Sequence, residues 1–510
     1  MAIVEAAPAT SDGRRHFTVR SPATLESIGE FRAANAADVN QAVARARAAQ
    51  PAWAALGPRG RAAHLDRARA YLVTHLEEFA ERIIADTGRS RTETVMMEIM
   101  SACDVLQYCA KRAPKILRDR RVRMHLMPHK KLRIVCRPLG VVGIIAPWNG
   151  PFIMGLDPTA QALVAGNAVL LKPSEITPLA GRLTADLFRA VGLPEGVLQV
   201  LDGDGETGAA LVEAGVDKIA FTGSTRTGRK VAEACARQLI PCSLELGGKD
   251  AMIVCEDAHV ERAVGGAVFG AMFNAGQYCC STERVYVAEA VAEPFIQGVV
   301  EKVKSLRQAT EGEFDVGPMI MPSQLEVIER HMADALAKGA KVLVGGRRRA
   351  ELGPNFYEPT VLVDVTHEML IMREETFGPI LPIMRIQDDR EALALANDSS
   401  YGLSGTVWSR SEARGLGLAR EMETGSVCVN EASMTFGAAE APFGGWKSSG
   451  VGQVHGENGL KGYCREQSII LDRFGLREEH NWYPLTREKG DVFARMARWV
   501  WGTPIGRWMS

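Results

Sequence analysis

The sequence predicts an α/β protein built on parallel sheets, and three observations support this class. Residues 36–117 are rich in alanine and carry apolar residues at helical spacing. From residue 141 onward, short apolar runs alternate with helix-like segments, which is typical of βαβ units. A second alternation of the same kind begins near residue 251 and ends near residue 429. A helical layer followed by two sheet-containing regions is therefore expected.

The elements of the first half are expected in a simple order. Helices are expected over residues 38–55 and 60–87, and alternating apolar and basic residues over 121–138 predict a half-exposed strand pair. Buried strands are expected at residues 141–145, 168–171, 197–201 and 218–221. Helices are expected at residues 158–166, 178–191, 207–214 and 229–239.

The second half repeats this alternation of strands and helices and ends in a tail of different composition. Strands are expected at residues 251–254 and 284–287, with a helix at 263–273 between them, and a further strand at 467–471. The last thirty residues interleave arginines with four of the eight tryptophans of the chain, Trp482, Trp499, Trp501 and Trp508. They also carry apolar residues at helical spacing, namely Val492, Phe493, Met496, Trp499 and Val500.

This tail allows three interpretations. It forms a basic amphipathic helix at a membrane surface, it covers a substrate entrance of its own or a neighbouring subunit, or it packs on the surface of an oligomer. The last interpretation has at least as much support from the sequence as the other two.

At 510 residues the chain is too long for one ordinary core, so several domains are expected. A Rossmann-like cofactor domain is expected at residues 1–122 and 141–247, and an α/β catalytic domain at 248–450. A small β element for oligomerisation is expected at residues 123–140 and 463–478, and an amphipathic extension at 481–510.

The composition narrows the function classes. An apolar content of 46% with 24% charged residues is that of a globular protein, and a net charge of −1 gives no reason to expect nucleic acid as a partner. Ten cysteines are too few for a disulfide scaffold and none shows C-x-x-C spacing, so reduced thiols and no metal site are expected. With no secretory signal and no membrane-spanning run apparent, a cytoplasmic location is expected.

The most informative stretch runs from Asn274 to Cys280, between a helix-like and a strand-like segment. A cysteine in a polar, glycine-bearing turn has backbone N–H groups near its sulfur, and this favours a reactive thiolate. Gly276 and Gln277 therefore favour Cys279 as a nucleophile over a buried structural cysteine. Cys280 competes for this role, but adjacent side chains point in different directions, and packing suits it better.

Four polar residues upstream are further candidates, two to assist such a nucleophile and two to hold a ribose. Glu245 precedes a Gly-Gly pair and becomes a general base if it is buried, although a surface strand residue is the ordinary alternative. Asn149 follows a strand, and its amide either holds an oxyanion or forms an Asn-Gly turn. Lys172 and Glu175 end another strand, where they hold a ribose or lie in a solvated loop.

A candidate phosphate site lies where a strand gives way to a helix at residues 221–228. Its glycines and hydroxyls suit a phosphate at a helix N-terminus, although an ordinary turn with a serine cap is equally compatible. The usual G-x-G-x-x-G fingerprint is absent. The residues concerned are Phe221, Gly223, Ser224, Thr225, Thr227 and Gly228.

Taken together, the motifs of residues 20–475 resemble those of the aldehyde dehydrogenase superfamily. Many of them occur in order, which makes a chance match negligible. They are Pro147-Trp-Asn149, Lys172-Pro-Ser-Glu175, Phe221-Thr-Gly-Ser-Thr225, Leu244-Glu-Leu-Gly-Gly248, Gly276-Gln-Tyr-Cys279, Glu375-Thr-Phe-Gly-Pro379, Asn397-Asp-Ser-Ser-Tyr-Gly-Leu403 and Pro442-Phe-Gly-Gly-Trp-Lys-Ser-Ser-Gly450.

The resemblance implies a role for each matching catalytic residue. Cys279 attacks an aldehyde, Asn149 and the Cys279 N–H hold the oxyanion, and Glu245 activates the water that hydrolyses a thioester. It also implies NAD bound without the usual fingerprint, with Lys172 and Glu175 at the adenosine ribose. Further cofactor contacts are implied for Ile145, Trp148, Gly205, Phe221, Gly223, Ser224, Thr227, Gly228, Leu246, Glu375 and Phe377.

Specificity follows from a few positions. The Glu175 carboxylate repels a 2′-phosphate, so NAD is expected over NADP. Gly150 and Asp157 replace bulkier residues of the common pattern, which predicts a wide tunnel for a medium or long aliphatic, or an aromatic, aldehyde. The alternatives are a coenzyme A acylating enzyme and a non-catalytic relative of the same fold. The resemblance further implies a homodimer or homotetramer.

Overall fold

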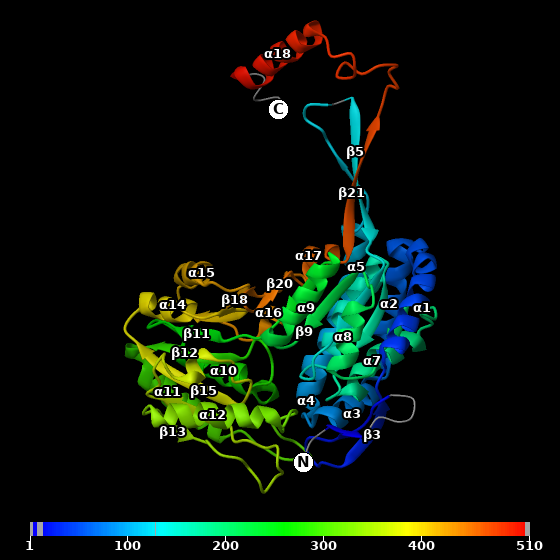
Figure 1. Cartoon of the computed structure of the whole chain (residues 1–510). Coiled ribbons are helices and arrows are strands. Elements are labelled where there is room, and N and C mark those ends of the chain that lie inside the picture. Colours follow the sequence, from blue (N-terminus) through cyan, green and yellow to red (C-terminus); the bar gives the residue numbers. More distant parts are fainter. Residues whose placement is uncertain (1–3, 8–13, 128, 505–510) are drawn as a thin grey trace. The chain divides into compact units, whose positions relative to one another are not determined.

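The structure is a computed structural model that describes residues 4–7, 14–127 and 129–504. It divides into two compact units, Met1–Ile116 with Pro138–Tyr463, and Leu117–Arg137 with Cys464–Ser510 (Figure 1). We call them the core unit and the basic unit, and describe each by itself. Parallel sheets flanked by helices make up the core unit, so the predicted α/β class is confirmed. The finer division into four parts stays a prediction.

The helical layer of the core unit begins at a capping box, because the Asn35 side chain accepts from the Asp38 N–H while the Asp38 carboxylate accepts from the Asn35 N–H. The helix expected at 60–87 is two helices that meet at His75, and the second ends at the left-handed Gly88. The elements are α1 (Ala36–Ala55), α2 (Gly57–Thr74), α3 (Leu76–Thr87), α4 (Arg91–Thr94), the π-helix η1 (Val95–Met100) and α5 (Ser101–Ile116).

A six-stranded sheet of order β20-β10-β9-β6-β7-β8 forms the first half of the core unit. Its strands are parallel except β20, and the three central strands, β6, β7 and β9, are almost entirely buried, as expected for a sheet covered on both faces. Its elements are β6 (Val141–Ile145), α6 (Ile153–Ala165), β7 (Ala168–Lys172), α7 (Pro178–Ala190), β8 (Leu198–Val200), α8 (Gly205–Glu213), β9 (Lys218–Thr222), α9 (Thr225–Gln238), β10 (Cys242–Glu245) and β20 (Gly450–Val451).

The chain order of this sheet reverses at β6. From β6 the chain adds β7 and β8 on one side, then crosses to place β9 and β10 on the other side. Such a topological switch point leaves a crevice at the carboxyl ends of the strands, where ligands of open α/β sheets bind.

A seven-stranded sheet of order β13-β14-β15-β12-β11-β17-β18 forms the second half, and its strands are parallel except at the β13–β14 edge. Its elements are β11 (Asp250–Val254), α10 (Val260–Met272), η2 (Phe273–Gly276), β12 (Thr282–Ala288), α11 (Glu289–Lys304), α12 (Ser323–Ala337), β13 (Lys341–Val344), β14 (Thr360–Val363), α13 (Leu370–Arg373), β15 (Ile380–Ile386), α14 (Asp389–Asn397), β17 (Ser404–Trp408), α15 (Glu412–Glu421) and β18 (Ser426–Val429).

Small elements complete the core unit. They are the three-stranded sheet β1 (Val4–Ala7), β2 (His16–Arg20) and β3 (Ser27–Arg32), the pair β16 (Tyr401–Gly402) and β19 (Trp446–Lys447), and the short helices α16 (Met434–Gly437) and α17 (Gly456–Lys461).

The basic unit consists of a three-stranded sheet and one helix. Its sheet has the order β21-β5-β4, with β4 (Arg120–Val122), β5 (Lys130–Pro138) and β21 (Cys464–Asp472), and α18 (Arg487–Gly502) follows. Thr486 caps α18 by accepting from the Lys489 N–H at 3.3 Å. Trp508 lies outside the described residues. In the part of the chain that the structure describes, no helix is long and apolar enough to cross a membrane.

Candidate active site

The switch point brings three of the predicted cofactor residues together. Ile145 ends β6, and its Cα is paired with that of Lys172 on β7 and that of Phe221 on β9. All three therefore lie at the carboxyl edge of neighbouring parallel strands, where the crevice opens.

Lys172 and Glu175 form an ion pair at this edge. The Lys172 Nζ donates to the Pro173 carbonyl at 2.9 Å and to the Glu175 Oε2 at 3.3 Å. Burial lowers the pKa of Lys172, and the Glu175 carboxylate opposes that shift. Glu175 is half-buried, so its carboxylate is fixed by the ammonium and still reaches the crevice.

The turn between β9 and α9 places small residues close to the backbone. Ser224 caps α9 by accepting from the Thr227 N–H at 3.3 Å, and the Gly223 N–H donates to the Glu245 carbonyl at 3.0 Å. A Cβ on Gly228 would lie 2.5 Å from Leu246, so a larger residue there would displace the Leu246 side chain. Gly205 is the first residue of α8. The turn is an ordinary capped helix start, and its glycines fit closely against Phe221 and Leu246. A helix N-terminus of this kind is also a position that suits a phosphate.

Glu375 and Phe377 lie on a loop of the catalytic half, beside the Gly247-Gly248 pair. The Glu375 Oε1 accepts from the Gly248 N–H at 2.9 Å, and burial raises the pKa of Glu375 to about 8. Phe377 has φ 52° and its ring meets the Trp148 ring edge-on, with centroids 5.5 Å apart. These contacts join predicted cofactor residues of both halves of the core unit.

A tight left-handed turn holds the candidate nucleophile. Asn274, Ala275 and Gly276 have φ values of 52°, 53° and 72°, and a Cβ on Gly276 would lie 2.2 Å from the Gly378 carbonyl oxygen. Only glycine permits both that φ and that approach.

The two adjacent cysteines after this turn differ in environment. Cys279 is half-buried, whereas Cys280 is buried, and the two sulfur atoms are 3.6 Å apart. The contact with Cys279, reinforced by burial, raises the pKa of the Cys280 thiol well above its ordinary value. Cys279 is therefore the better placed nucleophile.

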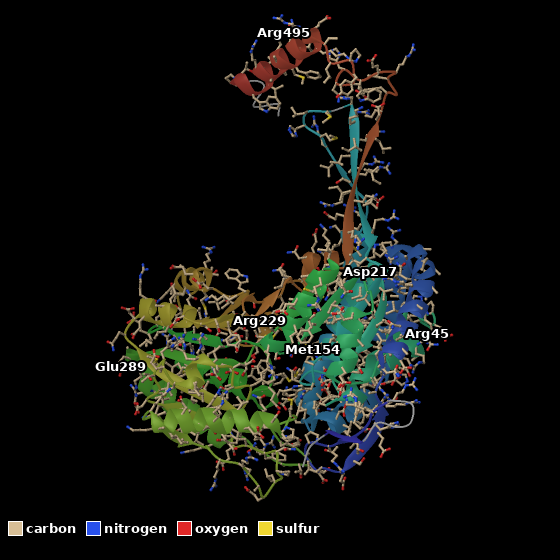
Figure 2. The ribbon with its side chains drawn as sticks, in the orientation of Figure 1. Arg45, Met154, Asp217, Arg229, Glu289 and Arg495 are labelled. Carbon is tan, nitrogen blue, oxygen red and sulfur yellow. The ribbon has the colours of Figure 1, made fainter. Side chains whose placement is uncertain are left out.

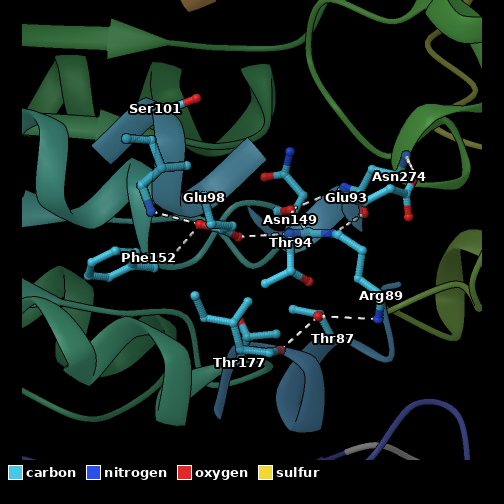
Figure 3. A network of polar contacts seen from close by, with 12 residues as sticks. Thr87, Arg89, Glu93, Thr94, Glu98, Ser101, Asn149, Phe152, Thr177 and Asn274 are labelled. Atoms are coloured by element: carbon cyan, nitrogen blue, oxygen red, sulfur yellow. Dashed lines mark hydrogen bonds and ion pairs between the residues drawn. The ribbon is translucent and has the colours of Figure 1, made fainter. Parts of the chain in front are cut away.

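A buried polar network holds this turn from behind (Figure 3). The Arg89 guanidinium donates to the Asn274 Oδ1 at 2.8 Å, to the Glu98 Oε1 at 2.9 Å and to the Asn149 carbonyl at 2.6 Å. Glu98 lies in the π-helix η1, and its other oxygen accepts from the N–H groups of Phe152 and Ile153 at the start of α6. One arginine thus ties the oxyanion candidate, the nucleophile turn and α6 to one another.

Asn149 is held at both ends by this network. Its carbonyl accepts from Arg89 and from the Asn274 amide, and its own Nδ2 donates to the Gln277 carbonyl at 3.0 Å. An amide nitrogen carries two hydrogens, and this bond uses one of them. The Asn149 side chain is thereby fixed against the backbone two residues before Cys279.

Glu245 is the last residue of β10, and its carboxylate is buried near Cys279. Neither of its oxygens has a hydrogen-bond partner among the described residues. Burial raises the pKa of Glu245 well above its ordinary value, and the nearby Cys279 and Asp157 raise it further. A carboxylate in this environment accepts a proton readily, as a general base requires.

Side chains surround Gly150 and Asp157, the two positions at which the sequence suggested a wider tunnel. A Cβ on Gly150 would lie 3.1 Å from Met154 and 3.3 Å from Met97, so methionine side chains occupy that position. Asp157 accepts from the Gln161 Nε2 at 2.7 Å and lies 3.2 Å from the His455 Nε2, which makes it part of a buried polar group. Flexible thioether chains border Gly150, and the expectation of a wider tunnel stays a prediction.

Sequence reasoning missed the groups that position the site. Arg89, Glu98 and His455 were not among the candidates, although each is buried. The pattern Ser90-x-x-Glu93 is typical of a helix start and marks one end of the network. No local pattern showed that Arg89 reaches Asn274, which is 185 residues away.

Comparison with known proteins identifies the class to which this fold and site belong. The profile described as the aldehyde dehydrogenase family matches residues 9–469, and the chain belongs to that family. The resemblance seen in the motifs is confirmed.

The similar proteins differ in the substrates that they are named for. The 4,4'-diapolycopene aldehyde oxidase of Methylomonas sp. is 39% identical over 484 residues, covering 94% of this chain and 91% of the relative. A putative succinate-semialdehyde dehydrogenase [NADP(+)] of Mycolicibacterium smegmatis is 40% identical over 466 residues, covering 91% and 90%.

A solved structure agrees with the fold of this chain. It is the Mycobacterium tuberculosis aldehyde dehydrogenase complexed with NAD+, at 35% identity and a TM-score of 0.87, covering 92% of this chain and 96% of that one. The protein is therefore an NAD(P)-dependent dehydrogenase that oxidises aldehydes.

Proposed function

We propose that the protein oxidises a medium or long aliphatic, or an aromatic, aldehyde to the carboxylic acid with NAD, using Cys279 as nucleophile. The observation that carries this proposal is the apolar cluster beside the thiol. It contains Met97, Phe273, Cys279, Phe436 and Phe443, together with Tyr278, Cys280, Leu403 and Val454. Such a lining binds hydrocarbon and offers little to a charged substrate.

The chemistry at Cys279 follows from the groups around it. The Cys279 sulfur adds to the aldehyde carbon, and the second N–H of Asn149 and the Cys279 N–H hold the resulting oxyanion. The oxidised product of that adduct is a thioester on the same sulfur. Glu245 takes a proton from the water that cleaves this thioester, which releases the acid and restores the thiol.

The crevice at the switch point fits a dinucleotide, and when bound NAD supplies the hydride acceptor. The buried Lys172 and the half-buried Glu175 suit the adenosine ribose, and the N-terminus of α9 that follows Gly223 suits phosphate oxygens. We propose NAD over NADP because the Glu175 carboxylate, fixed by Lys172, repels a 2′-phosphate. The relative from Mycolicibacterium smegmatis is named for NADP(+), so the preference is a property to be measured in this chain.

The substrates for which the two relatives are named, 4,4'-diapolycopene aldehyde and succinate semialdehyde, require different side chains around the aldehyde site. A semialdehyde with a second carboxylate needs a cationic partner. A small hollow is lined by Glu245 and Asp157 together with mainly apolar residues. Among the described residues, neither the lining of this hollow nor the apolar cluster includes a lysine or arginine. The site therefore favours an apolar aldehyde such as the one for which the Methylomonas relative is named.

A panel of aldehydes tests this proposal. NADH production is measured for acetaldehyde, octanal, dodecanal, benzaldehyde and succinate semialdehyde, each with NAD and with NADP. We expect kcat/KM to be highest for the longer or aromatic aldehydes with NAD. A higher kcat/KM for succinate semialdehyde or acetaldehyde would overturn the substrate class, and faster turnover with NADP would overturn the cofactor preference.

We also propose that the protein is a homodimer or homotetramer through β21. This strand lies at an edge of its sheet, and Ile470 and Leu471 on it are 59% and 42% exposed. An exposed edge strand pairs readily with a second chain. Sedimentation velocity tests this assignment, and a monomer at micromolar concentration would contradict it.

A further inference from the structure

The charge of the chain is distributed very unevenly between the two units. The basic unit, residues 117–137 and 464–510, contains 16 of the 60 lysines and arginines but only 7 of the 61 aspartates and glutamates. Its formal net charge is therefore +9, and that of the rest of the chain is −10, although the whole chain carries −1. A charge of this size on a small unit attracts an anionic surface.

The helix of the basic unit is amphipathic and exposes its apolar residues. Met496, Trp499 and Trp501 are 49%, 49% and 54% exposed, and Val500 is the single buried residue among those described in α18. Arg495 lies on the same helix (Figure 2), and Arg498 is exposed as well. Tryptophan beside arginine on a short exposed helix is typical of segments that lie in a lipid headgroup layer.

The apolar residues of the basic unit also form a hollow of about 670 Å³. Its walls combine aromatic and thioether groups with polar and charged ones, from α18, from the segment before it and from the turn between β4 and β5. They include Met127, Trp482, Phe493, Met496, Trp499 and Trp501. A hollow of this size lined by such groups has room for part of an acyl chain.

We propose that the basic unit docks the protein on the surface of an anionic phospholipid bilayer. The tryptophans of α18 enter the headgroup layer, and the arginines pair with lipid phosphates. A second copy of α18 is a poorer occupant of this face, because the exposed Arg495 and Arg498 would then face like charges. Since no described helix can cross a bilayer, the attachment is peripheral. This docking is independent of which aldehyde the enzyme prefers.

Vesicle binding by the full-length protein tests this proposal. Vesicles of phosphatidylcholine containing about one third phosphatidylglycerol are compared with vesicles of phosphatidylcholine alone, at low and high salt. We expect the protein to cosediment with the anionic vesicles at low salt, and tryptophan fluorescence to shift to the blue. Little binding is expected with phosphatidylcholine alone.

Two double variants separate docking from folding. Arg495→Glu with Arg498→Glu replaces exposed residues and should weaken binding to anionic vesicles at least about tenfold. Lys302→Glu with Lys304→Glu makes the same change of charge on exposed positions of α11 in the core unit, and should bind as the wild type does. Both variants should keep their NADH production in the absence of lipid.

Three outcomes would overturn the proposal. They are equal binding to neutral vesicles, undiminished binding by the arginine variant, and an equal loss in the lysine control. If the wild type binds no vesicle and the arginine variant instead changes the sedimentation coefficient, the face of α18 is an interface between copies of this chain.

Discussion

The turn that carries the proposed nucleophile and the proposed general base lie in the same buried site, yet they are held in opposite ways. Asn149, Asn274 and Gln277 are bound by several hydrogen bonds each, and Arg89 anchors the first two. Glu245 is equally buried, but neither of its carboxylate oxygens has a partner among the described residues.

This difference in hydrogen bonding matches the role proposed for each group. The oxyanion donor and the sulfur must stay in place while a bond forms, and a satisfied polar network gives that rigidity. A general base must take up and release a proton, and a partner that stabilised its charged form would lower its basicity. The contrast predicts that substitutions on the two sides fail in different ways.

The largest effect is expected at the sulfur itself. Cys279→Ala should reduce NADH production at least about 10³-fold, because no thioester can form. Cys280→Ala is the matched control, and it should keep most of the activity because its buried thiol only packs. Stopped-flow measurement of NADH decides the point, and full activity in the Cys279 variant would contradict the assignment.

The next effect is expected at the base, and it should spare the first turnover. Glu245→Gln should lower steady-state turnover about 10²–10⁴-fold, since hydrolysis of the thioester loses its base. A burst of NADH equal to the enzyme concentration should remain, because thioester formation precedes that step. Loss of the burst together with the turnover would mean that Glu245 also acts before acylation.

In the Arg89 network, a substitution is expected mainly to lower the stability of the fold. Arg89→Met leaves the Glu98 carboxylate buried without its cation, which should lower the free energy of unfolding by about 3–5 kcal/mol. The double variant Arg89→Met with Glu98→Gln removes the unpaired charge and should recover part of that loss. Urea denaturation measures both, and a single variant as stable as the wild type would contradict the network.

The smallest effect is expected in the pH profile. Because the Asp157 charge helps to raise the pKa of Glu245, Asp157→Asn should lower that pKa. Glu245 acts as a base only when ionised, so the acid limb of the kcat profile should move to lower pH. Asp66→Asn, at an exposed position on α2, is the control and should leave the limb in place. A limb that moves to higher pH in the Asp157 variant would contradict the sign.

The sequence predicted the parts of the molecule that depend on local periodicity and motif order. Four strands of the cofactor sheet, β6, β7, β8 and β9, appear within one or two residues of their expected positions, since buried parallel strands are continuous apolar runs. The helix expected at 60–87 was wrong as a single element, because His75 lies between two helices and no proline or glycine marks that break.

The supporting residues of the site could not be predicted for a physical reason. Arg89 is one charged residue in a helical stretch, and its partners lie 9, 60 and 185 residues away. Only the folded chain brings them together. The close approach of Met97 and Met154 to Gly150 could not be predicted either, because packing between distant segments leaves no local pattern.

The close approach of Gly276 to the Gly378 carbonyl has a consequence for anyone who wishes to re-engineer this enzyme. The turn that carries the nucleophile and the loop that carries Glu375 and Phe377 touch through main-chain atoms, with no side chain between them to absorb a shift. A shift of one segment is therefore expected to move the other. A loop transplanted to change the cofactor would also displace the sulfur unless its partner turn were transplanted with it.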